Sequence, residues 1–161
     1  MSAAAAERGS RARGMSMRPL RVVAALFLLL FLFGCGDGGL AQQAEALGLR
    51  DVEGFVETVQ SLCTRGVLPA RYITKAQARR LGWRPGRDLC TVAPGRVIGG
   101  DRFGNREGRL PEAPGRVWYE ADLDFACGRR GPRRLLFSSD GLIYVTVDHY
   151  RSFVRVACPK P

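Results

Sequence analysis

A chain of 161 residues with 46% apolar residues accommodates one domain of ordinary size plus a leader, which argues against a multidomain protein or a chain without a core. The formal net charge of +10 excludes an acidic protein and favours a polyanionic partner such as nucleic acid or an anionic surface. Arginine supplies nearly all of this charge, and an arginine bias also arises in GC-rich genomes without selection for nucleic acid.

The N-terminal segment is typical of a bacterial export signal. Arg18 and Arg21 precede an apolar run over residues 22–33, which is short for a membrane-spanning helix. Met17 can serve as the true start of the protein. We therefore predict a signal peptide over residues 1–34, and an exported protein.

The end of the apolar run resembles the lipidation signal of bacterial lipoproteins. Residues 32–35 read Leu-Phe-Gly-Cys, which departs from the usual lipidation pattern only at Phe33. This predicts a lipid anchor at Cys35, followed by a flexible tether that completes the segment 35–49, where small and polar residues are frequent. The alternative is a cleaved signal that releases a soluble protein. In both cases a single folded domain occupies residues 50–161.

Setting Cys35 aside leaves an even number of cysteines: Cys63, Cys90, Cys127 and Cys158. No C-x-x-C pair occurs and the chain has one histidine, so we predict no metal site. An even set of cysteines in an exported chain indicates two disulfides. Three pairings remain open at this point.

Two helices are predicted in the first half of the domain. Apolar residues at helical spacing over residues 52–63 form one stripe, and Gly66 ends the pattern. A capping box over residues 74–77 begins a second helix, which stops near Gly82. This places Lys75 in the first turn of that helix.

The second half of the domain has the two-residue period of strands, interrupted by turn residues. Helices followed by hairpin-connected strands predict an α+β fold, with N-terminal helices packed on a five-stranded antiparallel sheet. The predicted strands cover residues 96–98, 116–125, 133–138, 142–147 and 153–157.

The second of these strands has one polar face. Alternation over residues 116–125 places Glu120 on this face, and Arg134 on the following strand could lie opposite it. The residues that share the face with Glu120 are Trp118, Asp122 and Asp124.

His149 is the only histidine of the chain, so any histidine-dependent proton transfer must involve it. Together with the carboxylate of Glu120 and a group of arginines, it offers the acid, the base and the cations that metal-free cleavage of a phosphodiester requires. The alternatives are a structural or idle surface histidine, and a Glu120 that only pairs with Arg134. The arginines are Arg129, Arg130, Arg133 and Arg134.

Nine short segments between residues 72 and 156 occur together in the order and near the spacing of one known family. The set resembles the barnase-like, secreted bacterial guanyl-specific ribonucleases. The family has the fold class predicted above, helices packed on a five-stranded antiparallel sheet. The segments read YITK, LGW, VAPG, IGGD, NREG, LP, EAD, SSD and DHY.

The resemblance implies a catalytic role for five residues. Glu120 matches the general base and His149 the general acid, whereas Lys75, Arg130 and Arg134 match the cations that hold the scissile phosphate. The implied reaction is attack of a ribose 2′-hydroxyl on phosphorus, giving a 2′,3′-cyclic phosphate that is then hydrolysed. It requires no metal and no cofactor.

The resemblance also implies a guanine site, in which the Glu107 carboxylate accepts hydrogen bonds from the guanine N1 and exocyclic amine. Gly104 stands where the family has a serine. The residues that match this site are Phe103, Gly104, Asn105, Arg106, Glu107 and Tyr150.

The family fold further implies supporting contacts. It brings Cys90 close to Cys127, and Cys63 then pairs with Cys158. Two ion pairs are expected beside the site, Asp122 with Arg130 and Asp140 with Arg116.

The expected partners follow from the same resemblance. They are an RNA substrate and a barstar-like acidic inhibitor, which would protect the producing cell from the enzyme. The protein itself is expected to be a monomer. The membrane is expected to be a partner only through a lipid anchor at Cys35. Two other functions compete: a basic RNA-binding protein that has lost catalysis, and an antibacterial ribonuclease toxin.

Overall fold

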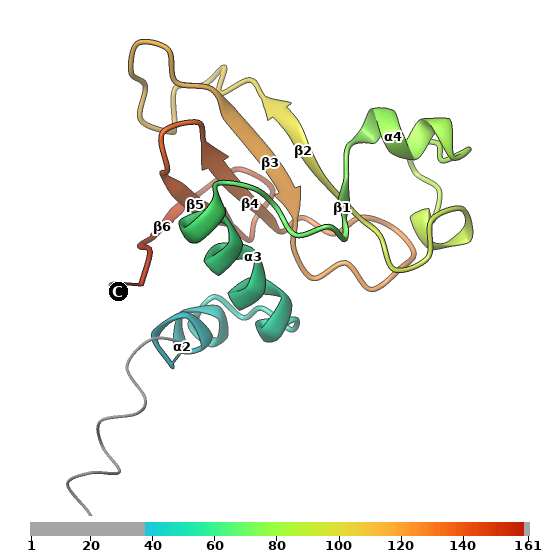
Figure 1. The fold of residues 1–161 in the computed structure, drawn as a ribbon, viewed down its shortest axis with the longest axis horizontal. Helices are drawn as coiled ribbons and strands as arrows, with labels where there is room; N and C mark the ends of the chain where they lie inside the picture. Colours follow the sequence, from blue (N-terminus) through green and yellow to red (C-terminus); the bar gives the residue numbers. More distant parts are fainter. Residues whose placement is uncertain (1–37, 160–161) are drawn as a thin grey trace, which may run out of the picture. The chain divides into compact units, whose positions relative to one another are not determined.

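The computed structural model describes residues 38–159, which form an α+β fold on a six-stranded mixed sheet with the order β1-β2-β3-β4-β5-β6 (Figure 1). The predicted signal peptide and Cys35 lie outside the described residues. Within residues 38–159 no helix is long and apolar enough to cross a membrane. The elements are α2 (Gly38–Ala46), α3 (Val52–Arg65), β1 (Tyr72–Ile73), α4 (Lys75–Arg80), the 3-10 turn η1 (Leu89–Thr91), β2 (Val97–Phe103), β3 (Trp118–Asp122), β4 (Arg134–Ser138), β5 (Ile143–Thr146) and β6 (Val154–Val156).

The first described segment is a helix and not a flexible tether. Helix α2 contributes Leu40 and Ala44 to the same buried cluster as α3, and Leu49 joins them. The Gln43 side-chain amide also donates to the backbone oxygen of Arg155 on β6, at 3.2 Å. The predicted tether is therefore wrong over residues 38–49, because Leu40 and Ala44, one turn apart on α2, and Leu49 after the helix are buried.

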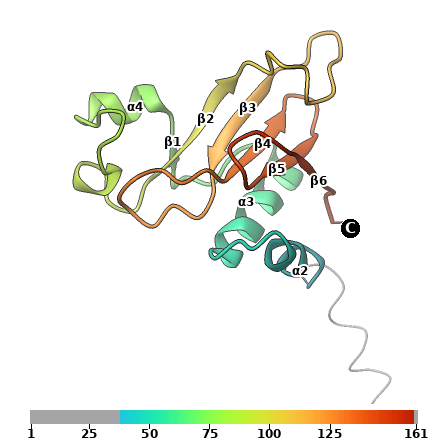
Figure 2. The ribbon, with the colours of Figure 1, turned by 180° about the vertical axis from the view of Figure 1, so that it is seen from behind.

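Helix α3 forms as its apolar stripe predicts. The Asp51 carboxylate caps it by accepting from the backbone N–H of Gly54 at 2.9 Å, and Gly66 ends it in a left-handed conformation. The stripe contributes the buried Phe55 and Val59, which pack in one cluster with sheet residues such as Leu135. Figures 1 and 2 show α3 beside β4 and β5 from both sides of the molecule.

The sheet has six strands and not the predicted five, and it is not purely antiparallel. The additional strand, β1, is two residues long and pairs in parallel with β2, Tyr72 with Val97 and Ile73 with Ile98. A parallel pair requires a crossover connection, and α4 with the loop after it provides one. A pair of residues is too short to show a strand period in the sequence, so β1 was not predicted.

Strand β2 extends well beyond its predicted end at residue 98, because two glycines carry it through a bulge. The register shifts between Gly99 and Asp101. A Cβ at Gly99 would lie 2.6 Å from the Tyr72 ring, and Gly100 has a φ of +90°, so other residues fit poorly at both positions. The bulge directs the Asp101 carboxylate to the backbone N–H of Lys75, at 2.8 Å.

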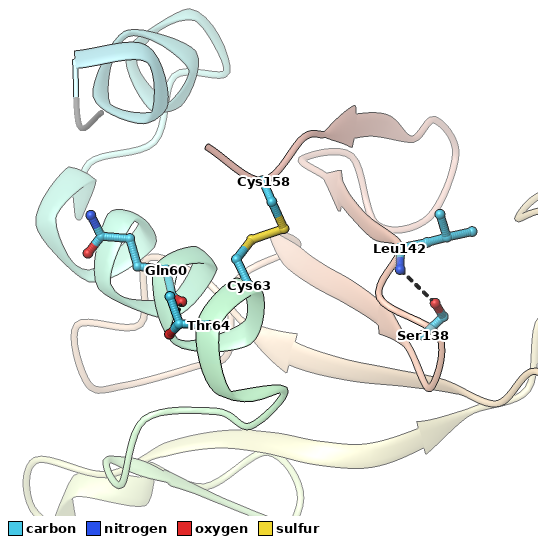
Figure 3. Close-up of a disulfide and its surroundings, with 6 residues drawn as sticks. All are labelled: Gln60, Cys63, Thr64, Ser138, Leu142 and Cys158. Atoms are coloured by element: carbon cyan, nitrogen blue, oxygen red, sulfur yellow. Dashed lines mark hydrogen bonds between the residues drawn. A yellow bond between two sulfur atoms is a disulfide. The ribbon is translucent and has the colours of Figure 1, made fainter. Parts of the chain in front are cut away.

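Both disulfides implied by the family resemblance are present. Cys63 on α3 joins Cys158 after β6, a link that Figure 3 shows between the helix and the C-terminal segment. Cys90 in η1 joins Cys127 in the loop after β3. The two links close sequence separations of 95 and 37 residues respectively.

Removing the longer link is expected to cost more stability than removing the shorter one. In the chain-entropy model, Cys63→Ser with Cys158→Ser should lower the free energy of unfolding by about 4–5 kcal/mol, and Cys90→Ser with Cys127→Ser by about 4 kcal/mol. Denaturant unfolding of the two double variants beside the parent protein measures both values. A larger loss from the 37-residue link would show that contacts, and not loop entropy, dominate.

Candidate functional site

The predicted polar face of β3 is the sheet face that α3 does not cover. Leu123 and Leu135 pack in the cluster that contains α3, whereas Trp118 and Leu136 form a separate cluster on the other face. Alternation along β3 then places Glu120 on the same side as Trp118.

The strand register gives Arg134 a different partner from the one predicted. Glu120 lies opposite Leu136, and Asp122 lies opposite Arg134. The Arg134 Nε lies 3.0 Å from an Asp122 oxygen, and both side chains are almost fully buried. The suggestion that Arg134 faces Glu120 is therefore wrong by one cross-strand pair, because hydrophobic alternation fixes the face of a residue but not its register.

Glu120 is 6% exposed and accepts hydrogen bonds on both carboxylate oxygens. Lys75 Nζ donates to Oε1 at 2.5 Å, and the Tyr150 hydroxyl donates to Oε2 at 2.6 Å. Burial alone would raise the pKa of Glu120, but these two hydrogen bonds and the charges of Lys75 and Arg130 bring it below its usual value. The carboxylate is thus ionised at neutral pH and can accept a proton.

The start of helix α4 fixes the position of Lys75. Thr74 caps the helix through its side chain, and Gln77 completes the predicted capping box by accepting from the Thr74 N–H at 2.7 Å. Lys75 follows as the first helical residue, with its own N–H bound to Asp101. This places the Lys75 ammonium against Glu120, 45 positions away in the chain.

The Asp122 carboxylate holds two arginines at once. Arg130 Nε and Nη2 donate to its two oxygens, each at 2.6 Å, and Arg134 lies on the same carboxylate from the neighbouring strand. Burial alone would lower the pKa of Arg130, but the hydrogen bonds to Asp122 raise it above its usual value. The expected Asp122–Arg130 pair is therefore confirmed, and Asp122, on the strand that carries Glu120, holds two arginines.

The arginine group is divided by the fold. Arg133 pairs with Asp124 at 3.1 Å, and Arg129 is exposed in the loop after β3. Both line a cavity of about 570 Å³ together with Arg50. The other expected pair, Arg116 with Asp140, is present at 2.6 Å.

The loop after β5 presents His149 to solvent. The Asp148 carboxylate folds this loop by accepting from the Thr146 hydroxyl at 2.9 Å and from the Ser152 hydroxyl at 2.6 Å. These hydrogen bonds, led by that of Ser152, hold the pKa of Asp148 well below its usual range. His149 and Tyr150 both adopt left-handed backbone conformations, with φ of 58° and 70°.

Tyr150 joins the parts of the site. Its ring lies 5.0 Å from the His149 ring and stacks on Phe103 at 5.3 Å, while its hydroxyl reaches Glu120. Burial first, and then the hydrogen bond to Glu120, raise the pKa of Tyr150 to about 12. The hydroxyl therefore stays protonated and continues to donate to Glu120.

A cavity of about 270 Å³ lies beside Tyr150, and all six residues predicted for base binding line it. The side chain of Asn105 exchanges two hydrogen bonds with the backbone of Leu110, at 2.9 and 3.0 Å, and so holds the loop that lines the cavity. The lining consists of Phe103, Gly104, Asn105, Arg106, Glu107, Arg109, Tyr150 and Phe153.

Sequence reasoning missed several residues at the site. Arg109 and Phe153 line the cavity, and Asp101 and Asp148 hold the backbone of the segments that carry Lys75 and His149. Arg109 directly follows the NREG segment, and Asp148 is the first residue of the DHY segment, so their closeness to these motifs was the available signal. Nothing in the sequence indicated the contacts they make.

Comparisons with known proteins agree on one family. A family model described as ribonuclease matches residues 56–157. The chain is 57% identical over 90 residues to a ribonuclease of Heyndrickxia coagulans, which covers 55% of this chain and 83% of the relative. Ribonucleases of Bacillus intermedius and Bacillus pumilus show the same identity over 90 residues, but there the match covers only 56% of each relative.

One solved structure is also similar to this chain. The crystal structure of ribonuclease Sa2 with guanosine-2'-cyclophosphate is 28% identical, and the match covers 58% of this chain and 91% of that one. Its TM-score is 0.33.

Proposed function

The chain belongs to the ribonuclease family, and from that premise we propose that it is a metal-independent endoribonuclease that cleaves single-stranded RNA on the 3′ side of guanosine. One observation supports this proposal above the others. Tyr150 contacts Glu120, His149 and Phe103. The candidate general base, the candidate general acid and the cavity predicted to bind the nucleobase therefore meet at one side chain. A single bound nucleotide can therefore engage all three.

In the proposed reaction Glu120 removes the proton of the ribose 2′-hydroxyl, whose oxygen then attacks the adjacent phosphorus. Each carboxylate oxygen of Glu120 already accepts one hydrogen bond and keeps a second lone pair for the hydroxyl. His149 protonates the departing 5′-oxygen, so the P–O5′ bond breaks as the P–O2′ bond forms. Water then hydrolyses the 2′,3′-cyclic phosphate with the two roles reversed.

The cations stabilise the negative charge that builds on the phosphorane oxygens. Arg130 and Arg134 are fixed on Asp122, so they need not reorganise as the charge develops. Lys75 serves both the phosphate and Glu120, whose proton affinity it lowers. The DNA backbone lacks the 2′-hydroxyl and does not react by this route.

Guanine preference is proposed from Glu107, which lines the base cavity. Its carboxylate can accept from both N1–H and the exocyclic amine of guanine, whereas adenine does not offer that pair of donors. The test is release of guanosine 2′,3′-cyclic phosphate from GpU in EDTA, compared with ApU. Absence of the cyclic product would exclude the mechanism, and equal turnover of both dinucleotides would exclude the preference. A basic RNA-binding protein without catalysis would release nothing.

Replacing Lys75 with methionine is expected to move the acid limb of the pH–rate profile to higher pH. Activity requires ionised Glu120, so kcat/KM falls as pH drops through the pKa of Glu120. Lys75 lowers that pKa, and its loss raises the pH at which the limb occurs. The profile of kcat/KM between pH 3 and 7 measures the shift, with Arg84→Gln as the control for loss of one exposed positive charge. An unmoved limb would contradict the assignment of Lys75 and Glu120.

We further propose export and lipid anchoring, which rest on Arg18, Arg21 and the residues up to Cys35. Expression of the full chain in a bacterial host should place the protein in the detergent phase, and Cys35→Ser should move it to the aqueous phase. Detergent partitioning that persists in Cys35→Ser would contradict the anchor. The proposed form is a monomer, and its basic site suits an acidic protein inhibitor made by the producing cell.

A further inference from the structure

One arginine connects the base cavity to the loop that carries His149. Arg109 Nε lies 2.7 Å from the Oε2 of Glu107. Its Nη1 donates to the backbone oxygens of Tyr150 and Arg151, at 3.2 and 2.7 Å. The same side chain lines the base cavity. A single guanidinium therefore touches both the Glu107 carboxylate and the backbone of the loop that carries His149.

These contacts contribute more to geometry than to stability. The side chains of Arg109 and Glu107 are 47% and 71% exposed, and exposed ion pairs stabilise a fold only slightly. The guanidinium is planar and presents its donors in fixed directions, so it can hold a carboxylate and two carbonyl oxygens at once. An ammonium group carries its three donors on one nitrogen and lacks the planar spread that reaches these acceptors together.

We propose that Arg109 is a positioning residue that sets guanine specificity by holding Glu107 in place for the base. The proposal rests on the function proposed above, because it gives Glu107 the role of reading guanine. An exposed glutamate without a partner samples several rotamers and loses that freedom when it binds a ligand. A carboxylate already held by Arg109 loses less, so guanine binds more tightly.

The second end of Arg109 determines where the bound base lies relative to the reacting groups. Since Arg109 is fixed on the backbone of Tyr150 and Arg151, Glu107 is held at a set place relative to the Tyr150 ring. That ring stacks on Phe103, and its hydroxyl binds Glu120. A guanine held at Glu107 is thereby aligned so that its ribose can reach Glu120.

The consequence is specific to guanine. Adenine offers Glu107 no matching pair of donors, so its cleavage does not depend on how Glu107 is held. Replacing Arg109 with glutamine should lower kcat/KM for GpU about tenfold, mainly through a higher KM, because a charged partner of Glu107 is lost. For ApU the change should stay within about twofold. Arg109→Lys should retain part of the discrimination, since it keeps the charge but not the fork.

The experiment measures kcat and KM for GpU and ApU in the parent protein, Arg109→Gln, Arg109→Lys, Glu107→Gln and the Glu107→Gln/Arg109→Gln double variant. Arg84→Gln, an exposed arginine after α4, is the matched control and should behave as the parent. If Arg109 acts through Glu107, the ratio of kcat/KM for GpU to kcat/KM for ApU should be no lower in the double variant than in Glu107→Gln alone.

Three results would overturn the proposal. One is an equal loss on GpU and ApU in Arg109→Gln, which would indicate a purely structural role in the His149 loop. The second is unchanged discrimination in that variant, and the third is a further loss in the double variant. A parent protein that cleaves neither dinucleotide, or both equally, would overturn the proposed function itself, so the two failures are distinguishable.

Discussion

Replacing Glu120 with glutamine is expected to lower kcat/KM for GpU by about 10³–10⁴-fold, at the upper end of what a positioned general base contributes. Glutamine has nearly the same shape and its side-chain oxygen can still accept a hydrogen bond from Lys75 or from Tyr150. It cannot take up a proton from the 2′-hydroxyl. The loss should therefore appear in kcat, with KM changed much less.

Two controls separate this effect from a loss of folding. Glu53→Gln removes an exposed carboxylate from the first turn of α3 and should leave kcat/KM within about twofold of the parent value. Denaturant unfolding of Glu120→Gln should still show one cooperative transition, because the 29% exposed side chain of Lys75 can reach water when its partner is neutral. A folded variant that keeps more than a tenth of the parent activity would exclude Glu120 as the base.

Replacing His149 with alanine is expected to lower kcat/KM for GpU by a similar factor, about 10³-fold, but to have a much smaller effect on an activated substrate. In guanosine 3′-(p-nitrophenyl phosphate) the leaving group is a weak base that departs without protonation. A general acid is then unnecessary for the first step, so the variant should cleave this ester within about tenfold of the parent rate.

The comparison of the two substrates is a clean test, since no second histidine in the chain can replace His149. An equal loss on GpU and on the activated ester would mean that His149 acts in folding or binding and not as the acid. Glu120→Gln serves as the contrast, because loss of the base should slow both substrates. Activity that survives in the Glu120→Gln/His149→Ala double variant would contradict the entire mechanism.

The helices and disulfides show how far local patterns reach. The apolar stripe and the glycine after it predicted α3, and the capping box predicted α4 with Lys75 in its first turn, because both depend on residues within one or two helical turns. The resemblance to the ribonuclease family predicted both cysteine pairings, which cysteine counting had left open. The short strand β1 was missed, since it exists only through its pairing with β2.

At the site, motifs and strand alternation indicated which residues could do the chemistry and which of them share a face of β3. Alternation placed Glu120 and Asp122 on one face, and the motifs named Lys75 and His149 as their companions. Which of these groups touch became visible only in the folded protein. Arg134 lies opposite Asp122 and leaves Glu120 to Lys75, because a strand pattern repeats every two residues and fixes no register.

The same distinction applies to Arg109. Its position near the base loop could be read from the sequence, but its contacts with Tyr150 and Arg151 join segments 41 and 42 residues apart. Contacts of that kind depend on how the loops close over the sheet, for which no local period exists. The sequence therefore indicated a candidate reaction class and candidate reacting groups, and only the fold showed which of these groups lie together beside Tyr150.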